Sequence, residues 1–170
     1  MQRVAVVGSG GAGKTTFATE LGKRTGIPVV HLDRIHWKPG WIEPPRDEWT
    51  KVVAEQAAGE KWVIEENHGG TFEIRFERAD TVIVMALSKW RCTSRVLRRT
   101  LTHYGREVHA DGCPERLDFK FVRWVWRSSR DSRPHLDGAL ARLNNRVRVI
   151  ELRSPREVRR FLAEFGAMGA

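Results

Sequence analysis

The chain has 170 residues, of which 41% are hydrophobic and 30% charged, and its formal net charge is +9. This length and apolar content suit a single domain over residues 1–170 with one hydrophobic core, and the basic charge favours nucleotides, nucleic acid or phosphorylated metabolites as partners. No run of about 20 apolar residues is present to span a bilayer. Cys92 and Cys113 lie far apart without C-x-x-C spacing, so neither a disulfide framework nor a four-cysteine zinc site is indicated.

An apolar strand is expected over residues 3–7, followed by a glycine-rich turn and a helix over residues 14–25. Because this strand begins at Arg3, we expect no signal peptide and a cytoplasmic protein. The oligomeric state expected is a monomer or a homodimer. The turn matches G-x-x-x-x-G-K-[ST] between a strand and a helix, which is typical of a P-loop. The phosphate-binding residues would be Gly8, Ser9, Gly10, Gly11, Ala12, Gly13, Lys14, Thr15 and Thr16.

These residue types predict binding of ATP or ADP together with Mg²⁺. Backbone N–H groups of the loop and the positive end of the helix dipole would surround the phosphates. Lys14 would neutralise the β- and γ-phosphate oxygens, the Thr15 hydroxyl would hold Mg²⁺, and Thr16 would reach the α-phosphate. The alternative is a glycine-rich turn that binds no ligand.

Short β-branched runs then alternate with longer amphipathic segments along the whole chain. The expected strands cover residues 3–7, 28–32, 61–65, 81–87 and 147–152. The expected helices cover residues 14–25, 47–58, 71–78, 88–104, 117–127, 131–143 and 155–165. This alternation predicts an α/β fold of three layers, with a five-stranded parallel sheet between two layers of helices.

The second expected strand leads into Asp33 and a loop that contains Trp37 and Trp41. Ligands of parallel α/β proteins bind beyond the carboxyl ends of the strands, so Asp33 is a candidate to orient an acceptor hydroxyl or hold a Mg²⁺-bound water. Its alternative role is to cap the following turn. Trp37 and Trp41 would form a stacking wall for a ring of the substrate, unless they serve only in packing.

The third expected strand ends at Glu65, which is followed by Glu66. Glu65 is the candidate for the carboxylate that holds Mg²⁺, whereas the alternative is a solvated acidic pair. On the next helix, Arg75 and Arg78 would bind a phosphate of the acceptor through their bidentate guanidinium groups. Alternatively they pair with nearby acids, which are Glu73, Glu77 and Asp80.

The helix expected over residues 88–104 has one apolar face and one arginine-rich face. Arg95 and Arg99 on the basic face are candidates for catalytic contacts with the transferred phosphoryl group, and residues 104–133 would form a lid insertion over it. The alternative is a solvated basic surface.

Taken together, the motifs resemble those of P-loop kinases of the nucleoside monophosphate kinase type, in particular the adenylate-kinase-related DNA topology modulation proteins. The resemblance runs nearly end to end and implies the strand order 2-3-1-4-5, a helical lid after the fourth strand, and a nucleotide base near Ser154 and Pro155. It rests on residues 8–16, His31-Leu32-Asp33, Trp37-Lys38-Pro39-Gly40-Trp41, Asn67, Gly69-Gly70-Thr71, residues 78–82, Gly112-Cys113-Pro114-Glu115-Arg116 and Leu152-Arg153-Ser154-Pro155.

The sequence departs from this family pattern at the rim of the expected pocket. Glu65-Glu66-Asn67 stands in place of Asp-Gly-Asn, and His68 stands in place of tyrosine. Ala86 and Ser88 replace the usual aspartate and proline after the fourth strand. These changes leave the nucleotide-binding residues in place but alter the carboxylates around the phosphoryl group.

The sequence therefore predicts a small kinase that transfers the γ-phosphoryl group of ATP to a nucleoside monophosphate or a small hydroxylated acceptor, through positioning and electrostatics. One alternative is a regulatory nucleotide-binding protein whose basic lid contacts nucleic acid. Another is a slow ATPase that needs no acceptor.

Overall fold

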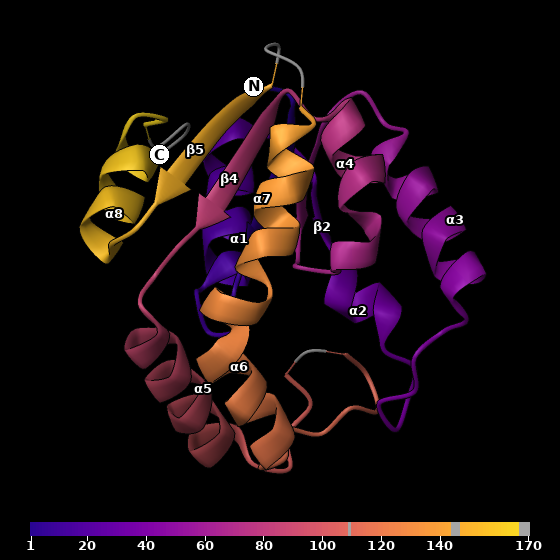
Figure 1. The fold of residues 1–170 in the computed structure, drawn as a ribbon, viewed down its shortest axis with the longest axis vertical. Helices are drawn as coiled ribbons and strands as arrows, with labels where there is room; N and C mark the ends of the chain where they lie inside the picture. The colour runs from indigo at the N-terminus through magenta and orange to yellow at the C-terminus, as the bar shows by residue number, and fades with distance from the viewer. Residues whose placement is uncertain (109, 144–146, 167–170) are drawn as a thin grey trace.

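Five parallel strands form a central sheet in the order β2-β3-β1-β4-β5, which confirms the predicted fold (Figure 1). The computed structural model describes residues 1–108, 110–143 and 147–166, without the side chains of residues 129–131. The strands are β1 (Arg3–Gly8), β2 (Val29–His31), β3 (Trp62–Glu65), β4 (Thr81–Met85) and β5 (Arg148–Leu152). β-branched residues dominate these strands because their side chains pack well on a sheet that is covered on both faces.

The register of the sheet brings the predicted site segments to one edge. Val6 of β1 pairs with Glu65 of β3, and Glu65 pairs with His31 of β2. All three strands are parallel, so the residues that follow them, including Asp33 and the P-loop, lie side by side at the carboxyl edge.

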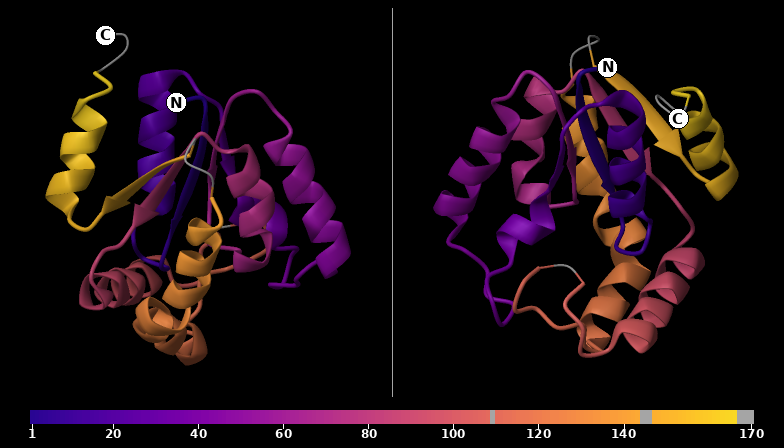
Figure 2. Two further views of the ribbon diagram at one scale, coloured as in Figure 1. Left: turned by 45° about the horizontal axis from the view of Figure 1, so that its top comes forward. Right: turned by 180° about the vertical axis from the view of Figure 1, so that it is seen from behind.

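Helices cover both faces of the sheet (Figure 2). One core cluster packs α1 (Lys14–Thr25) and α8 (Pro155–Ala163) on the sheet, and the other packs α3 (Arg46–Ala57), α4 (Phe72–Arg78) and α7 (Arg133–Ala141). Helices α5 (Lys89–His103) and α6 (Phe119–Asp131) pack against each other beyond the carboxyl edge. No helix in the described part of the chain is long and apolar enough to cross a membrane.

The structure corrects several predicted boundaries. Residues 32–36 form a short helix, α2 (Leu32–His36), where strand and loop were expected, because a helical turn places Leu32 and His36 together in the interior. A 3-10 turn, η1 (Gly69–Thr71), precedes α4. Helix α6 begins later than predicted because the Asp118 side chain caps it, accepting from the N–H groups of Lys120 and Phe121.

Candidate functional site

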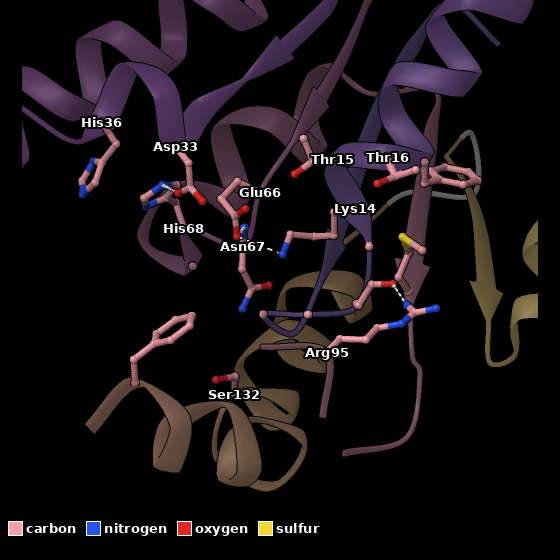
Figure 3. A pocket seen from close by; sticks show the side chains of 18 of the residues that line it. Lys14, Thr15, Thr16, Asp33, His36, Glu66, Asn67, His68, Arg95 and Ser132 are labelled. Atoms are coloured by element: carbon pink, nitrogen blue, oxygen red, sulfur yellow. Dashed lines mark hydrogen bonds and ion pairs between the residues drawn. The ribbon is translucent and has the colours of Figure 1, made fainter. Parts of the chain in front are cut away.

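The carboxyl edge of the sheet opens into a cavity of about 1590 Å³ (Figure 3). Its walls come from the P-loop, α1, α2, the segment after β3, α5, α6 and α8. Many predicted site residues line it: Gly10, Gly11, Ala12, Gly13, Lys14, Thr15, Thr16, Asp33, Trp37, Arg95, Arg99 and Pro155. The predicted residues outside this lining are Gly8, Ser9, Glu65, Arg75, Arg78 and Ser154.

The P-loop has a backbone shape that depends on glycine. Gly11 has φ 77°, and a Cβ atom there would lie 2.3 Å from the carbonyl oxygen of Cys92. Gly13 has φ 92° and is the N-cap of α1, with no side chain to satisfy the first N–H groups of the helix. The loop therefore passes close to α5 while the positive end of α1 stays available to an anion.

Lys14 is buried at the centre of the site. Its Nζ atom lies 3.1 Å from Glu66 Oε1 and donates to the carbonyl oxygen of Ser9 at 3.3 Å. Burial would lower the pKa of Lys14, but the charges of Glu66, Glu65 and Asp33 outweigh it, so the pKa is raised above its ordinary value. The lysine is therefore a fixed positive charge at the P-loop.

The pair formed by Thr15 and Glu65 fits a Mg²⁺ ion. Thr15 Oγ1 donates to Glu65 Oε1 at 3.1 Å, and His31 Nδ1 lies 2.8 Å from the same oxygen. Glu65 Oε2 is buried without a hydrogen-bond partner among the described residues. A buried, unpaired carboxylate oxygen is costly, and carboxylate and hydroxyl oxygens are the ligands that Mg²⁺ prefers.

Asp33 lies in the first turn of α2, across the cavity from the P-loop (Figure 3). The buried side chain of Leu32 anchors this turn, and His68 Nε2 lies 3.2 Å from Asp33 Oδ1. The carboxylate is partly exposed to the cavity, so a ligand can reach it. Asp33 and Lys14, which are distant in the sequence, thus face the same space.

Aromatic and imidazole rings surround the region next to Asp33. Trp37 contacts Trp41 with ring centroids 5.4 Å apart, and His36 contacts Trp49 at 4.5 Å and His68 at 4.2 Å. His36 Nδ1 and Trp49 Nε1 are buried, and neither has a hydrogen-bond partner in the described structure. The sequence prediction missed His36 and Trp49. His36 directly precedes Trp37 in the sequence, which could have indicated it, whereas Trp49 lies on α3 and reaches the site only through packing.

The pKa of His36 is lowered to about 4, mainly by burial and further by the charge of His68, against the opposing effect of Asp33. The folded protein therefore keeps His36 neutral, and its contribution to stability is lost as pH falls from about 6.5 toward 4. When the pH falls from about 7.5 to about 5, we expect the unfolding free energy of the unmodified protein to decrease by about 2 kcal/mol more than that of a His36→Phe variant. Urea unfolding at both pH values measures this difference.

His103→Phe is the control, because His103 is an exposed histidine on α5. The unfolding free energy of this variant should change with pH by the same amount as that of the unmodified protein. Equal losses in the unmodified protein and the His36→Phe variant would contradict the assignment.

Arg75 and Arg78 do not form the predicted phosphate clamp. Arg75 is fully buried and donates to the backbone carbonyls of Glu66 at 2.8 Å and His68 at 3.1 Å. Burial lowers its pKa to about 10, although Glu66 and Glu65 act in the opposite direction. Arg78 is exposed on α4 and donates to the carbonyl of Ala58 at 2.9 Å. Arg75 therefore holds the segment after β3 in place, and Arg78 points away from the cavity.

Because of this difference, we expect replacement of Arg75 and of Arg78 by methionine to lower the unfolding free energy by different amounts. Arg75→Met leaves buried carbonyl groups without donors and should lower the unfolding free energy by about 3 kcal/mol. Arg78→Met removes one exposed hydrogen bond and should cost less than about 1 kcal/mol. Chemical denaturation of both variants measures the difference, and similar costs would show that Arg75 does not support the loop.

Helices α5 and α6 close the cavity opposite α2. Arg95 Nη1 donates to the carbonyl of Ala12 in the P-loop at 3.2 Å, whereas Arg99 lies 3.3 Å from Glu115 Oε1. Ser128 of α6 is hydrogen-bonded to Ser9. Arg95 is therefore placed at the phosphate loop, and Arg99 is held by a buried carboxylate.

The predicted lid residues 104–133 comprise a loop and α6, and the movement of this segment remains a prediction.

A groove between α1 and α8 extends the cavity away from Asp33. Pro155, Val158, Arg159 and Leu162 line it from α8, a helical spacing that the sequence prediction did not use. Ser154 instead caps α8, because its Oγ atom accepts from the N–H of Glu157 at 3.2 Å. Of the two predicted base-binding residues, only Pro155 reaches the cavity.

Comparison with known proteins supports the fold. The chain is similar to a gluconokinase from Sinorhizobium meliloti 1021, with 18% identity, coverage of 96% of this chain and 92% of that chain, and a TM-score of 0.54. A shikimate kinase from Acinetobacter baumannii has 17% identity, coverage of 96% and 90%, and a TM-score of 0.60. A shikimate kinase from Bacteroides thetaiotaomicron has 15% identity, coverage of 96% and 95%, and a TM-score of 0.61. The chain has the fold of small P-loop kinases.

Comparisons of the sequence alone show less than the comparisons of structure. The family model of isopentenyl transferases matches residues 1–39, the part of the chain that holds the P-loop and Asp33. This match is too short to show membership of that family. No curated protein matches the chain. The kinase fold is confirmed, while the resemblance to nucleoside monophosphate kinases and topology modulation proteins stays a prediction.

Proposed function

We propose that the protein is a kinase that transfers the γ-phosphoryl group of ATP to a hydroxyl group of a small acceptor. The observation that carries this proposal is that Lys14 of the P-loop and Asp33 of α2 line one cavity. A nucleotide on the P-loop would extend along the groove beside Pro155, which leaves the region around Asp33 for the acceptor. The kinase fold of the neighbours supports this arrangement.

In the proposed reaction, the P-loop N–H groups and Lys14 hold the β- and γ-phosphates in line with the acceptor hydroxyl. Asp33 accepts the hydroxyl proton as the new oxygen–phosphorus bond forms and the bond to the bridging oxygen of ADP breaks. Arg95 adds positive charge beside the loop. Thr15 and Glu65 would hold Mg²⁺, which when bound offsets the charge of the phosphates.

The surroundings of Asp33 favour a hydroxylated ring compound over a nucleoside monophosphate. The rings of His36, Trp37 and Trp49 line the cavity there and provide flat faces for a ring of the acceptor. The predicted clamp for an acceptor phosphate is missing, because Arg75 is buried and occupied. Arg46 and Arg116 are exposed on the cavity wall and would bind an anionic group of the acceptor, either a carboxylate or a phosphate.

The test is Mg²⁺-dependent ADP production from ATP in the presence of cyclic alcohols, sugars, sugar acids, nucleosides and nucleoside monophosphates. We expect one hydroxylated ring compound to stimulate turnover and to appear phosphorylated by mass spectrometry. If ATP binds but no acceptor raises turnover, the kinase proposal fails. A slow ATPase or a regulatory nucleotide-binding protein that contacts nucleic acid would then explain the P-loop better.

A further inference from the structure

Glu66 has an unusual backbone conformation directly after β3. Its φ is 138°, in the region that favours glycine, yet it carries a long acidic side chain. Three hydrogen bonds hold it there: its N–H donates to Val6 O at 3.1 Å, its carbonyl accepts from Arg75 at 2.8 Å, and its Oε1 accepts from the Asn67 N–H at 2.7 Å. Backbone strain that is maintained by surrounding contacts is concentrated at functional sites.

This conformation directs the Glu66 carboxylate at the P-loop lysine. Figure 3 shows the two side chains facing each other in the cavity, and Glu66 Oε1 lies 3.1 Å from Lys14 Nζ. Lys14 is also influenced by the charges of Glu65 and Asp33. Glu66 is thus the carboxylate in direct contact with the ammonium group, and the guanidinium of Arg95 is bonded to the P-loop backbone at Ala12.

A phosphate that binds Lys14 would lie directly beside the Glu66 carboxylate or displace it, because Glu66 contacts the ammonium group. In either arrangement the carboxylate faces the phosphate oxygens, and like charges at such distances repel strongly in a partly buried site. A nucleotide that carries a divalent cation reduces this repulsion, because the cation attracts both the phosphates and the carboxylates. A nucleotide without a metal ion has no such compensation.

We propose that Glu66 makes the site selective for metal-bound nucleotide, by holding Lys14 in the nucleotide-free protein and repelling phosphates that arrive without a divalent cation. This inference rests on the nucleotide binding in the proposed function. It does not depend on the identity of the acceptor or on the rate of phosphoryl transfer. Glu66 thereby acts as a specificity-determining residue beside the P-loop lysine.

Isothermal titration calorimetry of ATP, with excess Mg²⁺ and with EDTA, tests the inference. The Glu66→Gln variant keeps the shape of the side chain and an oxygen for the Asn67 N–H but removes the charge. We expect this variant to bind metal-free ATP at least about tenfold more tightly than the unmodified protein, while its affinity for MgATP changes by less than about threefold. The control is Glu43→Gln, which removes an exposed carboxylate from the same cavity and should change neither affinity.

Glu66→Gly provides a second variant if the first folds poorly. Glycine adopts this φ without strain, so the Glu66→Gly protein keeps the backbone of the segment after β3 and should show the same gain in metal-free ATP affinity. If the unmodified protein binds MgATP and neither variant binds metal-free ATP more tightly, the inference is overturned and the kinase proposal stands. If the unmodified protein binds no nucleotide at all, both are overturned.

Discussion

Replacing Lys14 with alanine is expected to lower kcat/KM for ATP by about 10³-fold. Lys14 is the buried cation of the P-loop and lines the cavity, so in the proposed reaction it would lie against the charge that develops on the transferred phosphoryl group. Electrostatic groups that are held in place before the reaction make the largest contribution to such a transfer. A coupled ADP assay with the best acceptor measures the loss, and calorimetry measures the accompanying loss of MgATP affinity.

The same substitution also leaves Glu66 without its partner, so stability must be measured alongside activity. We expect Lys14→Ala to lower the unfolding free energy by about 1 to 3 kcal/mol, because it leaves a mostly buried carboxylate without a cation in contact. The double variant Lys14→Ala/Glu66→Gln should recover much of this stability but none of the activity. Activity that returned with stability would show that Lys14 has only a structural role.

Asp33→Asn is expected to lower kcat by about 10² to 10⁴-fold, because an amide cannot accept the proton of the acceptor hydroxyl. Binding of MgATP should change by less than about threefold, since Asp33 lies across the cavity from the P-loop. Single-turnover measurement of product formation, beside calorimetric titration of MgATP, separates these effects.

Asp47→Asn is the matched control, because Asp47 is an exposed aspartate in the first turn of α3, just as Asp33 is in the first turn of α2. An aspartate that only stabilises the start of a helix contributes about 0.3 to 1 kcal/mol to stability and nothing to turnover. If Asp33→Asn leaves turnover unchanged, as expected of Asp47→Asn, then Asp33 only stabilises the start of α2 and another group must activate the acceptor.

The parts of the site that are local in sequence could be predicted in detail. The P-loop spacing and the start of α1 at Lys14 agree with the structure, because the strand, glycine turn and helix are set by neighbouring residues. The position of Asp33 at the carboxyl edge also followed from its place after an apolar strand. The end of β3 at Glu65, at the same edge, followed for the same reason, while its role as a Mg²⁺ ligand stays a prediction.

Side chains whose partners are distant in the sequence could not be placed in this way. Arg75 and Arg78 lie on one short helix and are equivalent by pattern, but only Arg75 faces the buried carbonyls of the segment after β3. The contact of His36 with Trp49 likewise arises only when α2 and α3 pack together.

The sequence by itself therefore determined the α/β class, the phosphate-binding loop and the edge of the sheet where the site lies, because strand periodicity and glycine spacing are short-range properties. Only the tertiary structure decided which charges meet there. Lys14 is paired with Glu66 because parallel β1 and β3 are neighbours in register and a buried arginine holds the strained residue in place. Such long-range contacts depend on how the elements pack, and the residue types alone do not specify them.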